Sequence, residues 1–215
     1  MSCSPAIRLG ENLTVGYGAP LAACDREISL EAGTHYLLAR NGRGKTTLLR
    51  TLAGTLRAVA GRFEVAGRVR YLAEDLSFDA ELPAGAVIRA LVPRRRRAEA
   101  CELAGRIELD LRKPYAKLST GNRRKVLLVL AECSNPGGEP EVLFLDEPFS
   151  GLDAACREIF EQRWQHAGGH TLRLVSCHPD SERMAICSAV VIHHGRIAHQ
   201  AGATQSWQDL RGLLN

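Results

Sequence analysis

A glycine-rich segment at residues 39–47 constrains the fold of this chain most strongly. It reads Ala-Arg-Asn-Gly-Arg-Gly-Lys-Thr-Thr and follows the apolar residues 36–38. A strand that runs into such a loop and then into a helix is the layout of a phosphate-binding loop, whose backbone N–H groups surround an anion. The sequence therefore predicts an α/β fold with a phosphate site between its first buried strand and the next helix.

Several positions of this loop favour phosphate binding. Gly42 and Gly44 let the backbone bend inward, and Lys45 adds a positive charge near the β- and γ-phosphates. The Thr46 hydroxyl is placed to ligate Mg²⁺, and the helix from Thr47 onward directs its positive dipole end at the phosphates. The first glycine of the usual motif is Ala39 here, and its methyl group is tolerated at negative φ. The residues of the loop that we expect to bind nucleotide are Asn41, Gly42, Arg43, Gly44, Lys45, Thr46 and Thr47.

Two adjacent carboxylates follow an apolar segment in the second half of the chain. Residues 141–145 read Glu-Val-Leu-Phe-Leu and precede Asp146 and Glu147. A short unbroken apolar run is typical of a strand buried on both faces of a parallel sheet, and such strands present their last residues at the edge where ligands bind. We expect Asp146 to hold Mg²⁺ and Glu147 to orient and polarise the attacking water.

Four further segments resemble those of the ATP-binding cassette (ABC) ATPases. Residues 118–122, Leu-Ser-Thr-Gly-Asn, are similar to that family's Leu-Ser-Gly-Gly-Gln signature, and residues 150–153, Ser-Gly-Leu-Asp, to its D-loop. Residues 175–178, Val-Ser-Cys-His, resemble the segment of its switch histidine, and residues 189–197 resemble its closing hairpin. The segments occur in the family's order, and the resemblance covers essentially the whole chain.

The resemblance implies the architecture. We expect an α/β fold with a P-loop NTPase (RecA-like) core of the ABC ATPase type, in a single nucleotide-binding domain over residues 1–215. The expected parts are an antiparallel β-subdomain (residues 1–35 and 61–72), a βαβ core (residues 36–60 and 140–200) and an inserted α-helical subdomain (about residues 75–135).

The resemblance also assigns roles outside the two first motifs. Tyr17 stands where the family has an aromatic residue that stacks on adenine, and His178 where a histidine hydrogen-bonds the γ-phosphate. Ser119 and Gly121 would cap the γ-phosphate held by a second subunit. Within the signature, Thr120 replaces a glycine and Asn122 a glutamine, both with polar groups that form hydrogen bonds, so we expect a working signature.

Glu74 is the most informative departure from the family pattern. Most relatives have a glutamine there, which touches Mg²⁺ and the attacking water and senses the transmembrane partner. A glutamate still accepts a hydrogen bond from a metal-bound water, but it does not donate one, and it adds negative charge near the γ-phosphate. We expect Glu74 to be a catalytic and Mg²⁺ residue. Similar endings occur among ATPases of the ABC-2 class of exporters, which favours export.

Composition argues against several other classes of protein, such as membrane-spanning, secreted and nucleic-acid-binding proteins. No run of about 18 apolar residues occurs, and the N-terminus lacks the pattern of a signal peptide. The seven cysteines show no metal-binding or disulfide spacing, which indicates reduced thiols. A net charge of +4 is too small to indicate nucleic acid as a partner. The run of arginines at residues 94–97 resembles a lipid or nucleic-acid contact, but a solvated helix start is the favoured interpretation.

These expectations lead to one main function and two alternatives. The main one is an ATP-binding and ATP-hydrolysing subunit, with ATP and Mg²⁺, that powers export by a separate integral-membrane permease. It would pair head to tail with a second cassette, as a homodimer if the two are identical, and lie in the cytoplasm at the inner face of the cell membrane. The alternatives are a soluble ABC ATPase without a transport role and a catalytically weak regulatory cassette.

Overall fold

The computed structural model describes residues 4–137, 139–165, 169–177 and 186–205. The chain divides into two compact units, which are described separately. The first unit comprises residues 1–73, 140–147 and 167–215, and the second comprises residues 74–139 and 148–166.

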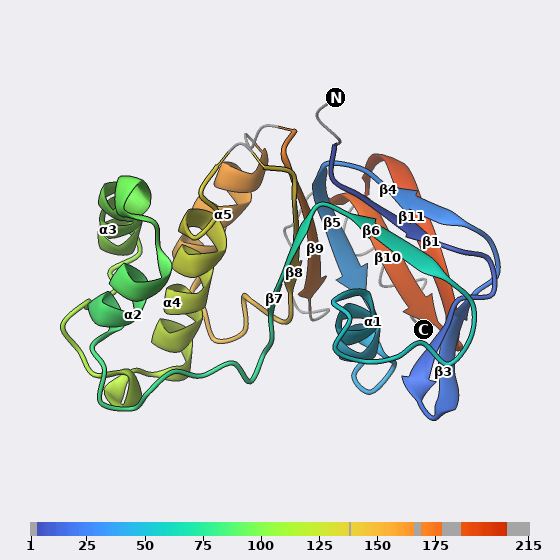
Figure 1. The fold of residues 1–215 in the computed structure, drawn as a ribbon, viewed down its shortest axis with the longest axis horizontal. Helices are drawn as coiled ribbons and strands as arrows, with labels where there is room; N and C mark the ends of the chain where they lie inside the picture. Colours follow the sequence, from blue (N-terminus) through green and yellow to red (C-terminus); the bar gives the residue numbers. More distant parts are fainter. Residues whose placement is uncertain (1–3, 138, 166–168, 178–185, 206–215) are drawn as a thin grey trace. The chain divides into compact units, whose positions relative to one another are not determined.

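The first unit contains a large mixed sheet with strand order β2-β3-β11-β10-β5-β9-β8-β7 (Figure 1). Its strands are β2 (Thr14–Tyr17), β3 (Ala19–Cys24), β5 (Gly33–Leu38), β7 (Arg68–Leu72), β8 (Glu141–Leu145), β9 (Thr171–Cys177), β10 (Ile186–His193) and β11 (Arg196–Gln205). From β10 through β5, β9 and β8 to β7, neighbouring strands run parallel. Parallel strands end at one common edge, so the segments after β5 and β8 meet there.

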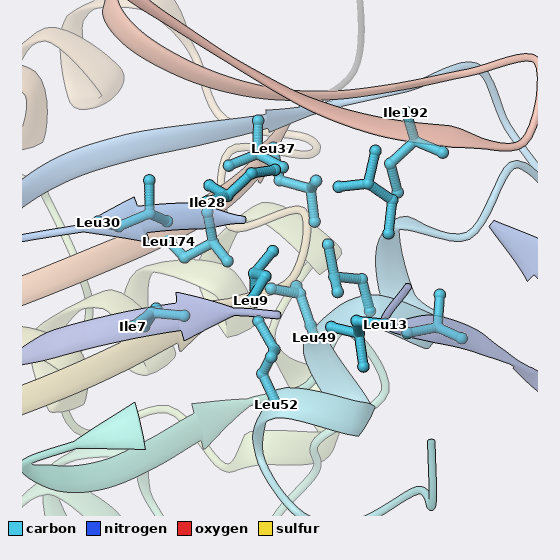
Figure 2. Close-up of a cluster of buried hydrophobic side chains, with 14 of the residues drawn as sticks. Ile7, Leu9, Leu13, Ile28, Leu30, Leu37, Leu49, Leu52, Leu174 and Ile192 are labelled. Carbon is cyan, nitrogen blue, oxygen red and sulfur yellow. The ribbon is translucent and has the colours of Figure 1, made fainter. Parts of the chain in front are cut away.

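The centre of this unit is apolar because its strands contribute large aliphatic and aromatic side chains. Every residue of β8 is buried, which the apolar run of residues 142–145 predicts for four of its five residues. Leu49 and Leu52 of α1 (Lys45–Leu52) lie in the same buried cluster as Leu37 of β5 and Leu174 of β9 (Figure 2). Burial of each such side chain contributes about 1.5–3 kcal/mol, so α1 is anchored to the sheet beside the strand that precedes it.

The antiparallel layer differs from its predicted composition. A small antiparallel sheet has the order β4-β1-β6, formed by β4 (Ile28–Leu30), β1 (Ala6–Leu9) and β6 (Phe63–Ala66). We expected residues 1–35 and 61–72 in this layer, but β2 and β3 belong to the large sheet, and β7 pairs there with β8 in parallel register. Gly67, with φ of 121°, forms the turn that separates β6 from β7. The two strands therefore belong to different sheets although one residue separates them.

The closing hairpin that the sequence indicated is present as β10 and β11. His194 and Gly195 connect them with φ of 47° and 73°. Two successive positive φ values are the backbone of a type I′ turn, which matches the twist of a two-residue hairpin. The hairpin places β10 beside β5, and β5 is the strand that leads into the phosphate-binding loop.

A chain of hydrogen bonds joins this hairpin to β5. The His35 Nε2–H donates to the Glu31 carbonyl oxygen (2.8 Å), and His35 Nδ1 accepts from the Ser188 hydroxyl (2.7 Å). Ser188 Oγ in turn lies 2.8 Å from His199 Nε2. Because the Ser188 hydroxyl hydrogen is donated to His35, we assign His199 Nε2–H as the donor to Ser188 Oγ. Burial lowers the pKa of both His35 and His199. The arrangement thus favours neutral imidazoles, because protonation would convert the accepting Nδ1 of His35 into a donor.

The histidine pair predicts acid sensitivity of folding. Because the folded-state pKa of His35 lies below its unfolded value of about 6.5, the unfolded chain binds more protons, so stability falls as the pH drops below about 6.5. The urea unfolding midpoint should be lower at pH 5 than at pH 7.5. The decrease should be smaller in His35→Asn, whose amide still pairs with Ser188 but does not titrate. Equal decreases in both proteins would contradict this role of His35.

The second unit is helical. It contains α2 (Ala84–Leu91), η1 (Arg94–Arg96), α3 (Arg97–Arg106), η2 (Tyr115–Lys117), α4 (Thr120–Cys133) and α5 (Ala154–Gln165). The segment expected as a helical subdomain, about residues 75–135, falls within this unit, to which residues 148–166 add α5.

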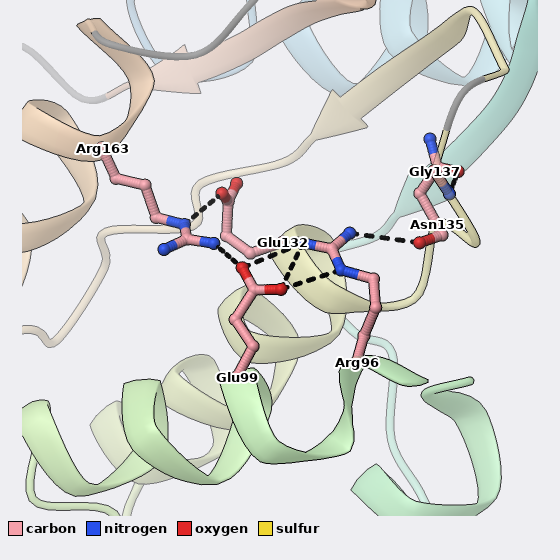
Figure 3. A network of polar contacts seen from close by, with 6 residues as sticks. All are labelled: Arg96, Glu99, Glu132, Asn135, Gly137 and Arg163. Atoms are coloured by element: carbon pink, nitrogen blue, oxygen red, sulfur yellow. Dashed lines mark hydrogen bonds and ion pairs between the residues drawn. The ribbon is translucent and has the colours of Figure 1, made fainter. Parts of the chain in front are cut away.

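Ion pairs connect three helices of the second unit (Figure 3). Arg163 of α5 contacts Glu99 of α3 and donates from Nε to Glu132 of α4 at 2.8 Å. Arg96 binds the same Glu99 carboxylate (Nη2–Oε2, 2.8 Å) and donates to the Asn135 carbonyl oxygen. Glu132 is buried, and the indole N–H of Trp164 donates to its other oxygen. Removal of one partner would leave buried charge unpaired, so this network holds α3, α4 and α5 together.

The arginine run is only partly the solvated helix start that the sequence suggested. Arg94 and Arg95 are exposed, in agreement with that interpretation. Arg96 takes part in the ion-pair network, and Arg97 donates to the carbonyl oxygens of Val92 and Arg89. Two of the four guanidinium groups therefore have structural contacts. Among the described residues, no helix has the length and apolar character needed to span a membrane.

Candidate nucleotide-binding site

The phosphate-binding loop connects β5 to α1 in the first unit. Gly42 and Gly44 have φ of 74° and 107°, in the left-handed region that favours glycine. A Cβ on Gly44 would also approach Leu21 Cδ2 to 3.1 Å. The helix begins at Lys45, two residues earlier than expected, and the first N–H groups of a helix have no intrahelical acceptor. The loop thus offers several backbone donors at the positive end of α1.

Lys45 connects the loop with the end of β8. Its side chain is 8% exposed, and Nζ donates to the Ala39 carbonyl oxygen at 3.1 Å. Nζ also lies 3.2 Å from Oε1 of Glu147, whose side chain is 16% exposed. The structure therefore brings together two residues, 102 positions apart in the numbering, that the sequence assigned to phosphate binding and to water activation.

Asp146 is buried and held by hydroxyl groups from both neighbouring strands. Tyr71 Oη at the end of β7 donates to Oδ2 at 3.2 Å, and Ser176 Oγ of β9 donates to Oδ1 at 2.8 Å. Burial and, secondly, the Asp146 charge raise the pKa of Tyr71 to about 12, so the phenol remains protonated and donates. These bonds keep the Asp146 carboxylate oriented, and carboxylate oxygens retain lone pairs for a metal ion.

Glu147 has an unusual backbone that its neighbours support. Its φ is 48°, a region in which non-glycine residues are strained. Ser176 Oγ accepts a 2.8 Å hydrogen bond from the Glu147 N–H, while the same hydroxyl donates to Asp146. Ser176 thereby orients both carboxylate residues at once. Sequence reasoning missed Tyr71 and Ser176, although hydroxyl residues near the ends of the strands beside β8 could have indicated them.

The remaining loop-side residues lie near the surface. Tyr17 is 62% exposed, which leaves its ring accessible for stacking, and its hydroxyl accepts from Arg50 Nη1 of α1 at 3.3 Å. Asn41 and Arg43 are exposed, whereas Thr47 is buried on α1. His178 lies outside the described residues.

The signature residues lie in the second unit, at the start of α4. Ser119 is the N-cap of this helix, and its Oγ accepts from the Asn122 N–H at 3.3 Å. Because that bond uses the oxygen as an acceptor, the hydroxyl hydrogen remains available to an anion. A Cβ on Gly121 would lie 2.5 Å from the Gly151 carbonyl oxygen, so only glycine fits where the signature contacts the D-loop segment.

The D-loop segment is itself anchored in the second unit. Asp153 Oδ1 accepts from the Cys156 N–H at 2.7 Å, which caps α5 and lowers the pKa of this carboxyl group. Lys125 Nζ of α4 lies 3.8 Å from Asp153 Oδ2. The signature and D-loop segments, which the sequence identified separately, thus form one contiguous surface of this unit.

Glu74 also belongs to the second unit. Its carboxylate Oε1 lies 3.1 Å from Arg124 Nη2 of α4, and its carbonyl oxygen accepts from Arg124 Nη1 at 2.6 Å. Arg124 was not among the residues predicted from sequence. The ion pair is a long-range contact between positions 74 and 124, which local patterns do not reveal.

Comparison with known proteins identifies the family. Residues 25–150 match the ABC transporter family. The chain is 33% identical over 212 residues to the daunorubicin resistance ATP-binding protein DrrA3 of Streptomyces coeruleorubidus, covering 88% of this chain and 66% of that protein. It is 35% identical over 210 residues to the zinc import ATP-binding protein ZnuC of Halorhodospira halophila, covering 90% and 76%.

Solved structures agree on the fold. An ATP-binding subunit of an ABC transporter superposes with a TM-score of 0.76 at 22% identity, covering 97% of this chain and 98% of that one. A putative ABC transporter ATP-binding protein from Pyrococcus furiosus gives 0.73 at 21% identity, covering 87% and 97%. The predicted P-loop NTPase fold of the ABC type is confirmed. The family match and these relatives show that the chain belongs to the ABC transporter family, as an ATP-binding subunit that hydrolyses ATP to power a membrane partner.

Proposed function

We propose that this chain binds MgATP in the loop between β5 and α1 and uses its hydrolysis to drive export. The backbone N–H groups of the loop and Lys45 would hold the phosphates, and Tyr17 would stack on adenine. Asn41, Gly42, Arg43, Gly44 and Thr47 would complete the cradle. The contact between Lys45 and Glu147 at 3.2 Å carries this proposal, because it unites the phosphate-binding and water-activating groups in one unit.

The donor set fits Mg²⁺. Asp146 is a buried carboxylate that two hydroxyl groups orient, and Thr46 carries its hydroxyl in the first turn of α1. Among the described residues, no group of three or more His, Cys, Asp or Glu side chains could hold a metal ion. This suits an ion that takes one or two protein ligands and completes its shell with phosphate oxygens and water. When bound, Mg²⁺ would neutralise charge on the phosphates.

Hydrolysis would begin when the triphosphate replaces Glu147 as the ion partner of Lys45. The triphosphate competes with Glu147 for the Lys45 ammonium group, since both present negative oxygens to the same cation. Once released, the Glu147 carboxylate accepts a proton from the attacking water, whose position it sets. Glu74 and His178 would complete the alignment of the water and the γ-phosphate. Positioning and charge neutralisation supply most of the catalysis in phosphoryl transfer.

The working form would be a pair of cassettes. Ser119 and Gly121 start a helix whose N–H groups and hydroxyl suit an anion, and we propose that they cap the γ-phosphate held by the other subunit. Two identical chains related by a two-fold axis would form two equal sites. ATP would join the pair, and hydrolysis would release it.

The partner would be a separate integral-membrane permease, with the chain at the inner face of the cell membrane. Two observations support outward transport. The chain is similar over 88% of its length to a daunorubicin resistance ATP-binding protein, and Glu74 departs from the glutamine that most relatives have. The similarity to a zinc import protein points in the opposite direction, so the direction of transport needs a direct measurement.

Transport in membrane vesicles tests this function. The chain would be expressed with the membrane protein encoded beside it, and daunorubicin would serve as the probe. Inside-out vesicles should accumulate the drug only with ATP outside. Lys45→Ala should abolish the uptake, because the triphosphate loses its main cation, whereas Lys113→Ala, at another lysine, should not. Uptake that needs ATP on the inside of right-side-out vesicles would indicate import and contradict the proposal.

A further inference from the structure

A buried arginine of the second unit binds one residue by two of its nitrogens. Arg124 Nη1 donates to the Glu74 carbonyl oxygen at 2.6 Å, and Nη2 lies 3.1 Å from the Glu74 carboxylate. The Arg124 side chain is 8% exposed, while that of Glu74 is 53% exposed. The guanidinium is therefore enclosed by the protein, and Glu74 is the more open end of the pair.

The burial of Arg124 makes this pair more than a surface contact. A buried guanidinium without a counter-charge costs several kcal/mol, whereas exposed ion pairs contribute little. Among the described residues, Arg124 Nε has no hydrogen-bond partner, so the two Nη contacts to Glu74 matter the more. Arg123, the next residue on α4, instead donates to the Ala116 carbonyl oxygen and lies over the Tyr115 ring. The two neighbouring arginines thus have different partners.

The Arg124–Glu74 ion pair has no net charge. This matters because Glu74 is expected to act near the negatively charged γ-phosphate. A lone carboxylate beside the γ-phosphate would repel a triphosphate. With Arg124 in contact, the Glu74 side chain presents roughly neutral charge to its surroundings. The contact uses the oxygen Oε1, and about half of the Glu74 side chain remains exposed to solvent.

We propose that Arg124 is a positioning residue that neutralises Glu74 and fixes it against α4, so that a carboxylate is tolerated beside the triphosphate. This inference rests on the proposed function, since it takes Glu74 to act near the γ-phosphate. Arg124 itself need not touch nucleotide. Its charge lowers the repulsion, and its two bonds hold the backbone and the carboxylate of Glu74 in one orientation.

Removal of the arginine charge provides the test. Arg124→Gln leaves the Glu74 carboxylate uncompensated, so MgATP should bind about 3- to 10-fold more weakly, an order of magnitude expected for one unit charge in a high-dielectric site. MgADP, which carries less negative charge, should be affected less, so the ratio of the two affinities should change. The double variant E74Q/R124Q contains no charge at either position and should restore the wild-type ratio. Isothermal titration calorimetry measures all of these affinities.

Two further variants separate charge from position. Arg124→Lys retains the charge but loses the two-nitrogen contact, so the affinity ratio should stay near wild type. Amide hydrogen exchange at residues 74–77, measured without nucleotide, should nevertheless become faster. Arg123→Gln removes a charge from the same helix without touching Glu74 and should change neither quantity. Circular dichroism confirms that each variant is folded, and if R124Q is not, hydrogen exchange in R124K still tests whether the contact holds Glu74.

The possible outcomes are distinguishable. An unchanged ATP-to-ADP ratio in R124Q, or equal weakening in R124Q and E74Q/R124Q, would assign Arg124 a purely structural role and overturn the proposal. Unchanged hydrogen exchange in both R124Q and R124K would show that the contact does not hold Glu74, and would also overturn it. If wild-type protein and Lys45→Ala both fail to bind MgATP, the proposed function itself is wrong, and the inference fails with it.

Discussion

Replacement of Glu147 by glutamine should lower ATP turnover by about 10²- to 10⁴-fold while MgATP binding persists, the range expected when a general base is lost. The amide has nearly the shape of the carboxylate, but it does not take a proton from water. Binding should persist because Lys45 and the loop N–H groups are unchanged. Removal of the ion partner at 3.2 Å from Lys45 should even favour the contact of this lysine with phosphate.

Phosphate release and calorimetry measure the two halves of this prediction. Glu139→Gln is a suitable control, since Glu139 is an exposed carboxylate shortly before the same strand. Its turnover should match that of the wild type. Wild-type turnover in Glu147→Gln would show that Glu147 is not the catalytic carboxylate. Weak turnover in the wild type itself, little different from that of the variant, would favour the regulatory cassette among the alternatives.

The Glu147→Gln protein should also form an ATP-bound dimer, and a second substitution should prevent it. Ser119→Arg places a bulky cation at the N-cap of α4, where the γ-phosphate of the neighbouring subunit is expected to dock. Ser119 lies in the second unit, whereas the loop residues that we expect to hold nucleotide within one chain lie in the first. ATP binding to the monomer should therefore remain, but ATP-driven dimerisation should be lost.

Size-exclusion chromatography with MgATP compares the single and double variants directly. The parent Glu147→Gln should elute as a dimer, and S119R/E147Q as a monomer. Ser29→Arg in the same background introduces an equal cation at an exposed serine of β4 and should still dimerise. Dimerisation of S119R/E147Q equal to that of its parent would mean that residues 118–122 do not complete a neighbour's site. The chain would then act as a single-site ATPase.

Local sequence patterns predicted the elements whose structure depends mainly on residues adjacent in the chain. The alternation of an apolar strand, a glycine-rich loop and a helix predicted β5, the phosphate-binding loop and α1, since glycine at positive φ and a helix N-terminus depend on adjacent residues. The fully apolar run before Asp146 predicted the buried strand β8 for the same reason. The hairpin of β10 and β11 was expected from the resemblance of residues 189–197 to the ABC family, and its two-residue turn became visible only in the structure.

The sequence did not predict which strands pair with one another in the sheets. Residues 68–72 were expected in the antiparallel layer, because the resemblance to the ABC family places the whole of residues 61–72 there. Its partner was decided by the turn at Gly67 and by pairing with β8, more than 70 residues away in the chain. Hydrogen bonds between strands are made by backbone groups common to all residues, so they do not identify the partner strand from sequence.

The sequence by itself thus determined which chemical groups the proposed site contains: a lysine and glycines expected to bind phosphate, two carboxylates expected to act on metal and water, and a signature expected to complete a neighbour's site. Only the tertiary structure decided how those groups are held. Tyr71 and Ser176 orient Asp146 from the two flanking strands, and Arg124 binds Glu74 across 50 positions. Such contacts depend on the parallel order of β7, β8 and β9 and on the packing of α4, and both arise from long-range burial of apolar surface rather than from any local motif.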